Sequence, residues 1–214
     1  MASEITFKGV KLLVKEGDLT EEKADAIVNP ANTKGLMAGG LSLAIKQKGG
    51  EQIEKDATAA APTLKWNAYA TTAGKLAARK VIHAPTVQEP GWKSEARIID
   101  RATRGALGVA KDISARTISF PGLGCGTGGV PKVEAAQTMI SATRYFLAEN
   151  EGHHSIREIR FVAFDEELEK AFDTALATLE VKPAAPAAPA VEAAGEPSEP
   201  EEAAEEPPTA PAGE

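Results

Sequence analysis

Two carboxamide side chains, Asn29 and Asn32, stand just after the short apolar run 26–28, and two glycines follow at positions 39 and 40. Each carboxamide offers both a hydrogen-bond donor and an acceptor, a combination suited to binding hydroxyl groups. The glycines let main-chain N–H groups approach a ligand closely, because no Cβ stands in the way. A helix expected to begin near Leu41 adds the positive end of its dipole. The stretch therefore predicts a site for an anion such as phosphate.

A second glycine-rich stretch, 122–129, follows the apolar run 117–120 and precedes Pro131. Proline is common in the first turn of a helix, so the succession of strand, glycine loop and helix start occurs twice. Ligands of open α/β sheets bind beyond the carboxyl ends of the strands, so two such loops would hold a diphosphate from both sides. The alternative is that the glycines only make tight turns between strand and helix.

Other nucleotide-binding and catalytic signatures do not fit these loops. Neither loop ends in Gly-Lys-Ser or Gly-Lys-Thr, which excludes a P-loop NTPase, and the second lacks the acidic residue that follows a dinucleotide fingerprint. Cys125 lies near a helix start, but no histidine is close in sequence to activate it, so a loop-filling role is favoured over a nucleophile. One cysteine and three histidines exclude an internal disulfide and disfavour a protein-held zinc site. We expect no metal and no resident cofactor.

The elements that must carry these loops alternate between strand and helix patterns. Strands are expected at 5–16 (one or two antiparallel edge strands), 26–28 (ended by Asn29 and Pro30), 67–72, 80–84, 117–120 and 158–164. Helices are expected at 41–48, 51–61, 93–112, 131–149 and 166–179. In the expected helix 131–149, helical spacing places five residues on the face that packs against the core: Val133, Ala136, Ile140, Thr143 and Leu147. His83 is expected to be a hydrogen-bonded structural histidine. The alternation predicts an α/β fold, a three-layer α/β/α sandwich around a mixed, largely parallel sheet with an antiparallel edge.

Composition divides the chain of 214 residues into a domain, 1–180, and a tail, 181–214. The tail holds eight of the fourteen prolines, eight Glu and one Lys, so it is expected to be disordered and carries the whole net charge of −7. The domain is near neutral, which gives no indication of direct nucleic-acid binding. No secretory signal or membrane-spanning run is visible, so a cytoplasmic protein without membrane attachment is expected.

The two loops resemble those of the macrodomain family, in which an Asn-x-Ala-Asn segment is followed by a Gly-rich run and a helix. Here the segment is Asn29-Pro30-Ala31-Asn32, with Gly39-Gly40 after it. The resemblance extends back to Gly17-Asp18-Leu19-Thr20 and forward to the second loop, Phe-Pro-Gly-Leu-Gly-Cys-Gly-Thr-Gly-Gly-Val-Pro at 120–131. It covers roughly residues 5 to 180.

This resemblance implies an ADP-ribose pocket. It assigns Asp18 to the exocyclic amine of the adenine and Phe164 to stacking on the adenine ring. A local cap is the alternative for Asp18. Phe164 could also be a core residue, a role that is compatible with stacking on the adenine. The implied ligand contacts are Asp18, Leu19, Asn29, Ala31, Asn32, Gly39, Gly40, Leu41, Ser42, Gly124, Cys125, Gly126, Thr127, Gly128 and Phe164. Asn32 is the implied catalytic residue if the protein turns a substrate over.

Three residues depart from the family pattern. Ser42 occupies the position at which hydrolases of the family have an aspartate, and serine is a poor general base near neutral pH. Ala38 replaces the first glycine of the usual triplet. Gly128 stands where many members have an aromatic residue, which predicts a more open distal pocket.

The expected function is therefore binding of ADP-ribose, of an ADP-ribosylated macromolecule or of an ADP-ribose ester. The alternative is a hydrolase that removes ADP-ribose from protein or nucleic acid, or that cleaves O-acetyl-ADP-ribose or ADP-ribose-1″-phosphate.

Overall fold

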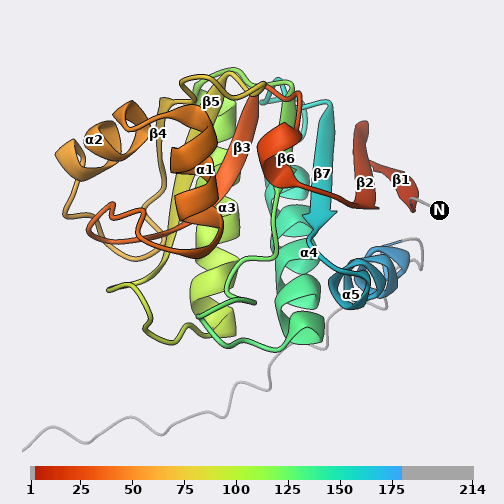
Figure 1. Cartoon of the computed structure of the whole chain (residues 1–214). Helices are drawn as coiled ribbons and strands as arrows, with labels where there is room; N and C mark the ends of the chain where they lie inside the picture. Colours follow the sequence, from red (N-terminus) through yellow and green to blue (C-terminus); the bar gives the residue numbers. More distant parts are fainter. Residues whose placement is uncertain (1–2, 180–214) are drawn as a thin grey trace, which may run out of the picture. The chain divides into compact units, whose positions relative to one another are not determined.

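The computed structural model describes residues 3–179, so the predicted tail lies outside the described residues. A seven-stranded sheet has the order β1-β2-β7-β6-β3-β5-β4 (Figure 1). The strands are β1 (Glu4–Phe7), β2 (Val10–Glu16), β3 (Ala26–Asn32), β4 (Tyr69–Thr72), β5 (Lys80–Val87), β6 (Thr117–Phe120) and β7 (Glu158–Ala163). The five inner strands run parallel, and the two edge strands β1 and β4 are antiparallel to their neighbours. This is the mixed, largely parallel sheet that the sequence predicted.

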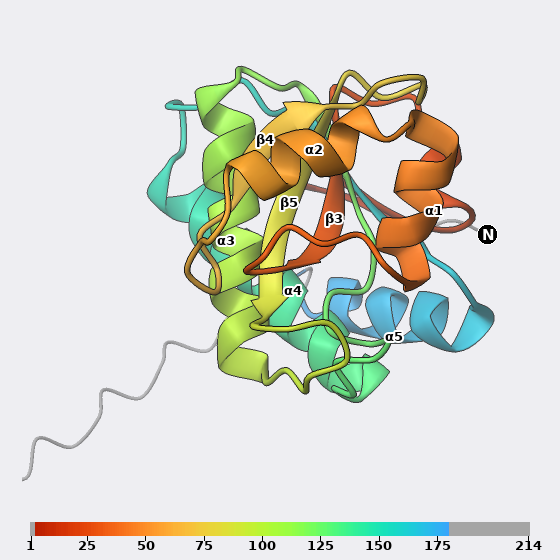
Figure 2. The ribbon, with the colours of Figure 1, turned by 60° about the vertical axis from the view of Figure 1, so that its left-hand side comes forward.

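Helices cover both faces of the sheet, which confirms the three-layer arrangement (Figure 2). One side carries α1 (Gly40–Gly49) and α2 (Gln52–Ala59), which contact β3 and β4. The other side carries α3 (Ala96–Asp112), α4 (Lys132–Glu149) and α5 (Glu166–Ala177). A short 3₁₀ helix, η1 (Leu19–Glu21), follows β2. No helix within residues 3–179 is both long enough and apolar enough to cross a membrane.

The main hydrophobic core lies between the sheet and helices α3, α4 and α5. Three fully buried rings pack in series, with centroids 6.0 Å apart for Phe120 and Phe161 and 5.1 Å apart for Phe161 and Phe172. The inward prediction for α4 holds for Ala136, Ile140, Thr143 and Leu147. It is wrong for Val133, which is 54% exposed because it lies in the first helical turn.

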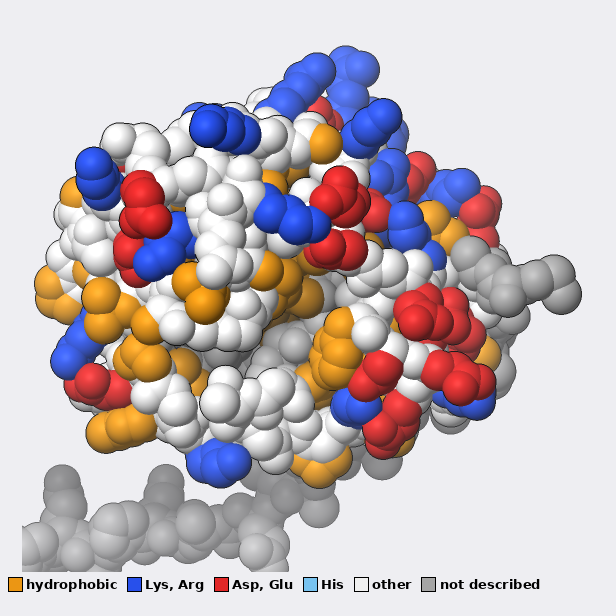
Figure 3. Space-filling model, in the orientation of Figure 1, with side chains coloured by type: hydrophobic (Ala, Val, Ile, Leu, Met, Phe, Trp, Pro, Cys, Tyr) orange, Lys and Arg blue, Asp and Glu red, His pale blue; other side chains and the backbone are white. Residues whose placement is uncertain are grey.

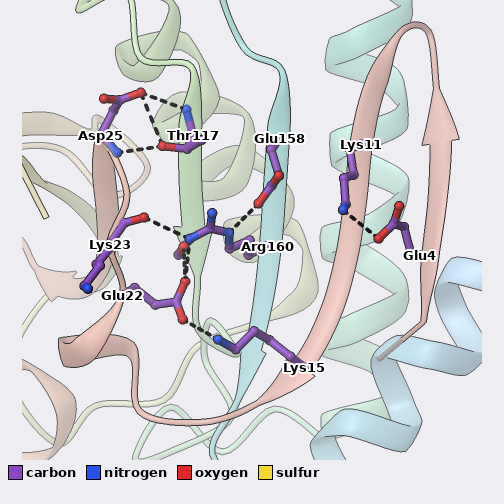
Figure 4. A network of polar contacts seen from close by, with 10 residues as sticks. Glu4, Lys11, Lys15, Glu22, Lys23, Asp25, Thr117, Glu158 and Arg160 are labelled. Carbon is purple, nitrogen blue, oxygen red and sulfur yellow. Dashed lines mark hydrogen bonds and ion pairs between the residues drawn. The ribbon is translucent and has the colours of Figure 1, made fainter. Parts of the chain in front are cut away.

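A polar network, rather than a helix, packs on the α1 side of the sheet over β2, β7 and β6 (Figure 4). Its centre is the carboxylate of Glu22, which is 6% exposed and accepts from Lys15 at 2.7 Å, Ser119 at 2.9 Å and Arg160 at 3.0 Å. Burial opposes its ionisation, but these three donors together hold the pKa of Glu22 below its ordinary value. Two ion pairs, to β2 and β7, and one hydrogen bond, to β6, therefore join the loop before β3 to three strands of the sheet.

Candidate functional site

The predicted site residues lie at, or just after, the carboxyl ends of four consecutive strands of the sheet. Asp18 follows β2, Phe164 follows β7, the second glycine loop follows β6, and the first glycine loop follows β3. Since these strands are parallel and lie in the order β2-β7-β6-β3, the four groups stand in a row along one edge of the sheet. Figure 3 shows this face hollowed between the side that carries α1 and the side that carries α5. The topology therefore brings together residues that are distant in sequence.

Asp18 and Phe164 form the β2–β7 end of the row. Asp18 caps η1, because its Oδ1 accepts from the main-chain N–H of Thr20 at 2.8 Å and from its hydroxyl at 2.6 Å. Its Oδ2 accepts from Lys48 at 2.9 Å, and the side chain is still half exposed. The Thr20 hydrogen bonds, followed by Lys48, lower the pKa of Asp18. A local cap and an available carboxylate therefore coexist at this position.

Phe164 is 59% exposed, so a core position is excluded and much of the side chain can be contacted from solvent. The Lys132 ammonium lies 5.3 Å from the ring centroid and is itself held by Asp165 and Glu167, each at 2.6 Å. Asp165 also caps α5 by accepting from the N–H of Leu168. The aromatic ring therefore lies beside a group of paired charged side chains at the start of α5.

The first loop is closed by the side chain of Asn32, which is 6% exposed. Its Oδ1 accepts from the N–H groups of Lys34 and Leu36 at 3.1 and 3.2 Å, and its Nδ2 donates to the carbonyl of Leu36 at 2.7 Å. Met37 is buried beneath the loop, and its N–H donates to Glu54 at 2.7 Å. Asn32 therefore shapes the loop, and its predicted contact with a distal ribose or a role in catalysis stays a prediction.

Helix α1 begins in the first loop without a side-chain cap. Its N-cap is Gly39, so no side chain takes up the N–H groups of the first turn. A Cβ at Gly39 or Gly40 would meet open space, and Gly40 has a φ of +55°, which favours glycine. Ala38 is exposed, Leu41 is half-buried and Ser42 is buried. This arrangement offers N–H groups and a positive helix end to an anion.

Asn29 and Ala31 lie behind the loop rather than in it. Asn29 is 1% exposed, and its amide pairs with Nδ1 of His83 at 3.1 Å while its Oδ1 accepts from the Ser42 hydroxyl at 2.8 Å. Both polar ends are therefore engaged inside the protein, which gives Asn29 a structural role, and its predicted contact with a ligand stays a prediction. Ala31 and Leu19 are likewise buried, at 3% and 4% exposure.

The second loop presents its open face at Gly126 and Thr127, both of which are exposed. A Cβ at Gly126 would meet nothing within 4 Å. A Cβ at Gly128 would lie 2.7 Å from the carbonyl oxygen of Gly124, so the loop itself requires glycine there. The more open distal pocket that Gly128 predicts, in place of the aromatic residue of many family members, stays a prediction.

Cys125 is half-buried within the second loop. Burial raises the pKa of its thiol to about 11, and the Lys132 ammonium only partly opposes this effect. A thiol with so high a pKa is protonated at neutral pH, so the loop-filling role fits better than a nucleophile.

A separate cleft of about 510 Å³ lies beyond the first loop, next to the end of β5. Its lining includes Thr33, which follows Asn32, together with Gln88 and Trp66. None of the residues predicted to contact the ligand lines it. We place the candidate site in the row of loops, because the uncapped helix start and the open glycines are there and not in this cleft.

Several residues that support the site were not anticipated from the sequence. Lys48 and Lys132 hold the two carboxylates at the β2–β7 end, and Glu54 anchors the first loop. His83 was expected to be hydrogen-bonded, and it is fully buried, but its pairing with Asn29 could not be read from the sequence. The only available signal was the shared position of Asn29 and His83 in adjacent parallel strands, which requires the register.

The sequence model of the Macro domain family matches residues 28–139, just over half of the chain and including both glycine loops. The chain belongs to the macrodomain family. This macrodomain is 42% identical over 163 residues to an uncharacterized protein of Aquifex aeolicus, a match that covers 76% of this chain and 96% of that protein.

Solved macrodomains share the fold. The Oceanobacillus iheyensis macrodomain with ADP superposes with a TM-score of 0.74 at 25% identity, over 84% of this chain and 97% of that one. The Trypanosoma brucei macrodomain in complex with ADP-ribose superposes with a TM-score of 0.68 at 26% identity, over 76% of this chain and 68% of that one. These similarities confirm the family and the fold that the sequence predicted.

Proposed function

We propose that this macrodomain binds ADP-ribose, either free or attached to a macromolecule, in the groove along the carboxyl edge of its sheet. The observation that carries the proposal is the order of the groups along that edge. A carboxylate and an exposed aromatic ring stand at the β2–β7 end, and two glycine loops with helix starts follow at β6 and β3. ADP-ribose has the same order of groups, with adenine at one end, a diphosphate in the middle and a distal ribose beyond it.

Two solved relatives support the choice of ligand, since the Oceanobacillus iheyensis structure contains ADP and the Trypanosoma brucei structure contains ADP-ribose. The geometry supports binding better than hydrolysis. The Ser42 hydroxyl donates its proton to Asn29, so it is not placed as a general base. The same proposal places the protein in the cytoplasm, which is supported by a single cysteine and by the nature of the ligand.

Titration calorimetry tests the proposal directly. ADP-ribose should bind with one-to-one stoichiometry, and AMP should bind more weakly because it lacks the second phosphate and the distal ribose. Equal affinity for AMP and ADP-ribose would show that the loops after β6 and β3 do not hold a diphosphate.

A matched pair of variants locates the groove. Gly126→Val adds a side chain where a Cβ meets open space, so it should block the groove without disturbing the fold. Gly108→Val makes the same change in α3, where a Cβ also meets nothing within 4 Å and no loop is near in sequence. We expect at least a tenfold loss of ADP-ribose affinity, on the order of 1.4 kcal/mol, for the first variant only. Equal affinities for the two variants would place the ligand elsewhere.

A further inference from the structure

A chain of four buried polar side chains links the end of β4 to the first turn of α1. Thr71 Oγ1 lies 2.9 Å from Nε2 of His83, and Nδ1 of His83 lies 3.1 Å from the amide nitrogen of Asn29. Asn29 Oδ1 then accepts from the Ser42 hydroxyl at 2.8 Å. We call these four residues the His83 relay. Their exposures are 7% for Thr71, 0% for His83, 1% for Asn29 and 8% for Ser42, so bulk water does not replace any link.

The register of the sheet places the central members of the relay side by side. Asn29 in β3 stands opposite His83 in β5, and His83 stands opposite Tyr69 in β4. The Tyr69 ring stacks on the imidazole, with centroids 5.0 Å apart and an interplanar angle of 10°. The imidazole is therefore fixed in position by its neighbours, and only its protons are free to vary.

Two arrangements of protons satisfy the heavy-atom positions, and they differ at both ends of the relay. In the first, Thr71 donates to the carbonyl of Thr72 at 3.0 Å, His83 donates from Nε2, and Ser42 donates to Asn29. In the second, the Asn29 amide is turned over, Thr71 donates to His83, and the Ser42 proton must go to the carbonyl of Pro30 at 3.4 Å. The first arrangement is favoured because it uses a 3.0 Å contact where the second uses one near the limit for a hydrogen bond.

We propose that His83 is a positioning residue that acts through Asn29: as the neutral tautomer protonated at Nε2, it directs the Ser42 proton inward and so fixes the first turn of α1. That this turn binds ADP-ribose rests on the proposed function, whereas the direction in which the relay's protons point does not. With its proton engaged by Asn29, Ser42 offers only oxygen lone pairs to any group that approaches the turn. An anion is then held by main-chain N–H groups and not by this hydroxyl.

The charges around the imidazole agree with this role. Burial lowers the pKa of His83 to about 4, although Asp56 of α2 opposes the shift. The Tyr69 phenol of β4 faces the ring, and burial raises its pKa to about 12, so it is neutral as well. His83 therefore stays uncharged through the neutral range, which the first arrangement requires because Nδ1 must accept.

The direction of the relay is tested without any ligand. Nuclear magnetic resonance of the ¹⁵N-labelled full chain at neutral pH should show Nε2 of His83 protonated and Nδ1 as an acceptor. Ser42→Ala should leave this tautomer unchanged, because Asn29 keeps its amide toward Nδ1. A proton on Nδ1 in the unaltered protein would overturn the proposal.

The action through Asn29 is tested by paired variants and ADP-ribose calorimetry. His83→Leu removes the acceptor and should weaken binding about tenfold, the order of one buried hydrogen bond. His83→Asn keeps a side-chain oxygen near the Nδ1 position and should restore most of the affinity. In a Ser42→Ala background, His83→Leu should cause no further loss, because the group that the relay orients is gone.

The outcomes separate this proposal from the proposed function. If His83→Leu weakens binding equally with and without the Ser42 hydroxyl, or if His83→Asn does not restore it, His83 only fills space and the proposal is wrong. If His83→Leu does not fold, two measurements still decide the question. They are the ADP-ribose affinity of His83→Asn relative to the unaltered chain, and the tautomer of His83 in the unaltered chain. If the unaltered protein does not bind ADP-ribose, the proposed function fails, whereas the tautomer still tests the relay.

Discussion

Asp18→Asn is the substitution that best probes the adenine end of the groove. In the folded protein Oδ1 is already engaged by both donors of Thr20, at 2.8 and 2.6 Å. An asparagine can keep its oxygen on Thr20 and preserve the cap of η1. Its amide nitrogen must then point where Oδ2 now faces Lys48 and the solvent. The variant therefore replaces an acceptor with a donor on the ligand side, and it also removes the ion pair between Oδ2 and Lys48.

The size of the effect follows from the exposure of the carboxylate. A hydrogen bond to a charged group is worth about 1.5–3 kcal/mol, and the 51% exposed side chain places this one toward the lower end. We therefore expect ADP-ribose to bind about 10- to 30-fold more weakly to the Asn variant. Asp18→Ala should weaken binding by a similar factor and should also lower the melting temperature, because it removes the cap as well.

Calorimetry with two ligands makes the test specific. The hypoxanthine analogue of ADP-ribose carries a carbonyl oxygen in place of the exocyclic amine. The unaltered protein should prefer ADP-ribose, and Asp18→Asn should shift the preference toward the analogue, because its amide can donate to the carbonyl. Glu21→Gln is the matched control, because the Lys48 ammonium that pairs with Asp18 also pairs with Oε1 of Glu21, at 2.5 Å. The Glu21 side chain is 70% exposed. If Asp18→Asn and Glu21→Gln bind both ligands alike, Asp18 does not contact the base.

Three further predictions follow from other parts of the chain. Cys125, whose thiol pKa is raised to about 11, should react with iodoacetamide at pH 7 far more slowly than an unfolded control; rapid labelling would contradict its loop-filling role. The pKa of Glu22 is lowered on folding, so its stabilisation is full above the ordinary Glu value near 4.3 and is lost as pH falls through the folded pKa. Glu22→Gln should therefore lower the melting temperature more at pH 7 than at pH 3, and an equal loss at both values would count against the network. Deleting residues 181–214, which composition assigns to a tail, should leave the melting temperature and ADP-ribose affinity nearly unchanged, and a large loss of either would show that the segment packs on the domain.

The fold was readable from the sequence because a parallel sheet covered on both faces produces continuous apolar runs between amphipathic helices. Strand β6 was predicted at the residues where it occurs. Strand β5 was predicted to end at Ala84 but continues to Val87, past Pro85. In the same way, β3 was predicted to end before Asn29 but continues to Asn32, past Pro30. The register with β3 shifts between Ala31 and Asn32, an irregularity of the kind that accommodates a proline in a strand. Local sequence does not reveal such compensation from a partner strand.

The site was readable only in part. Glycines and a helix start indicate an anion site because they expose main-chain N–H groups and the positive end of a helix. These properties are local, so the two loops could be placed from the sequence. The role of Asn29 could not, because an amide next to a glycine loop has the same local pattern whether it faces a ligand or a buried histidine. The decision depends on His83, which is 54 residues further along the chain and reaches Asn29 only across the sheet. Similarly, the contact between Gly128 and Gly124 depends on the closed shape of the loop.

The order of strands in the sheet also constrains how the chain reaches its native state. Strands β3, β4 and β5, with α1 and α2, come from the continuous segment 26–87, and β3 pairs with β5 inside this segment. Strand β2 ends at Glu16, but its parallel partner β7 begins only at Glu158, so this pairing closes a very long loop. Long-range parallel pairing is slow, and we expect the N-terminal hairpin to join the sheet last. During synthesis β6 would keep an unpaired edge until β7 emerges from the ribosome, and that interval is when the chain is most exposed to aggregation.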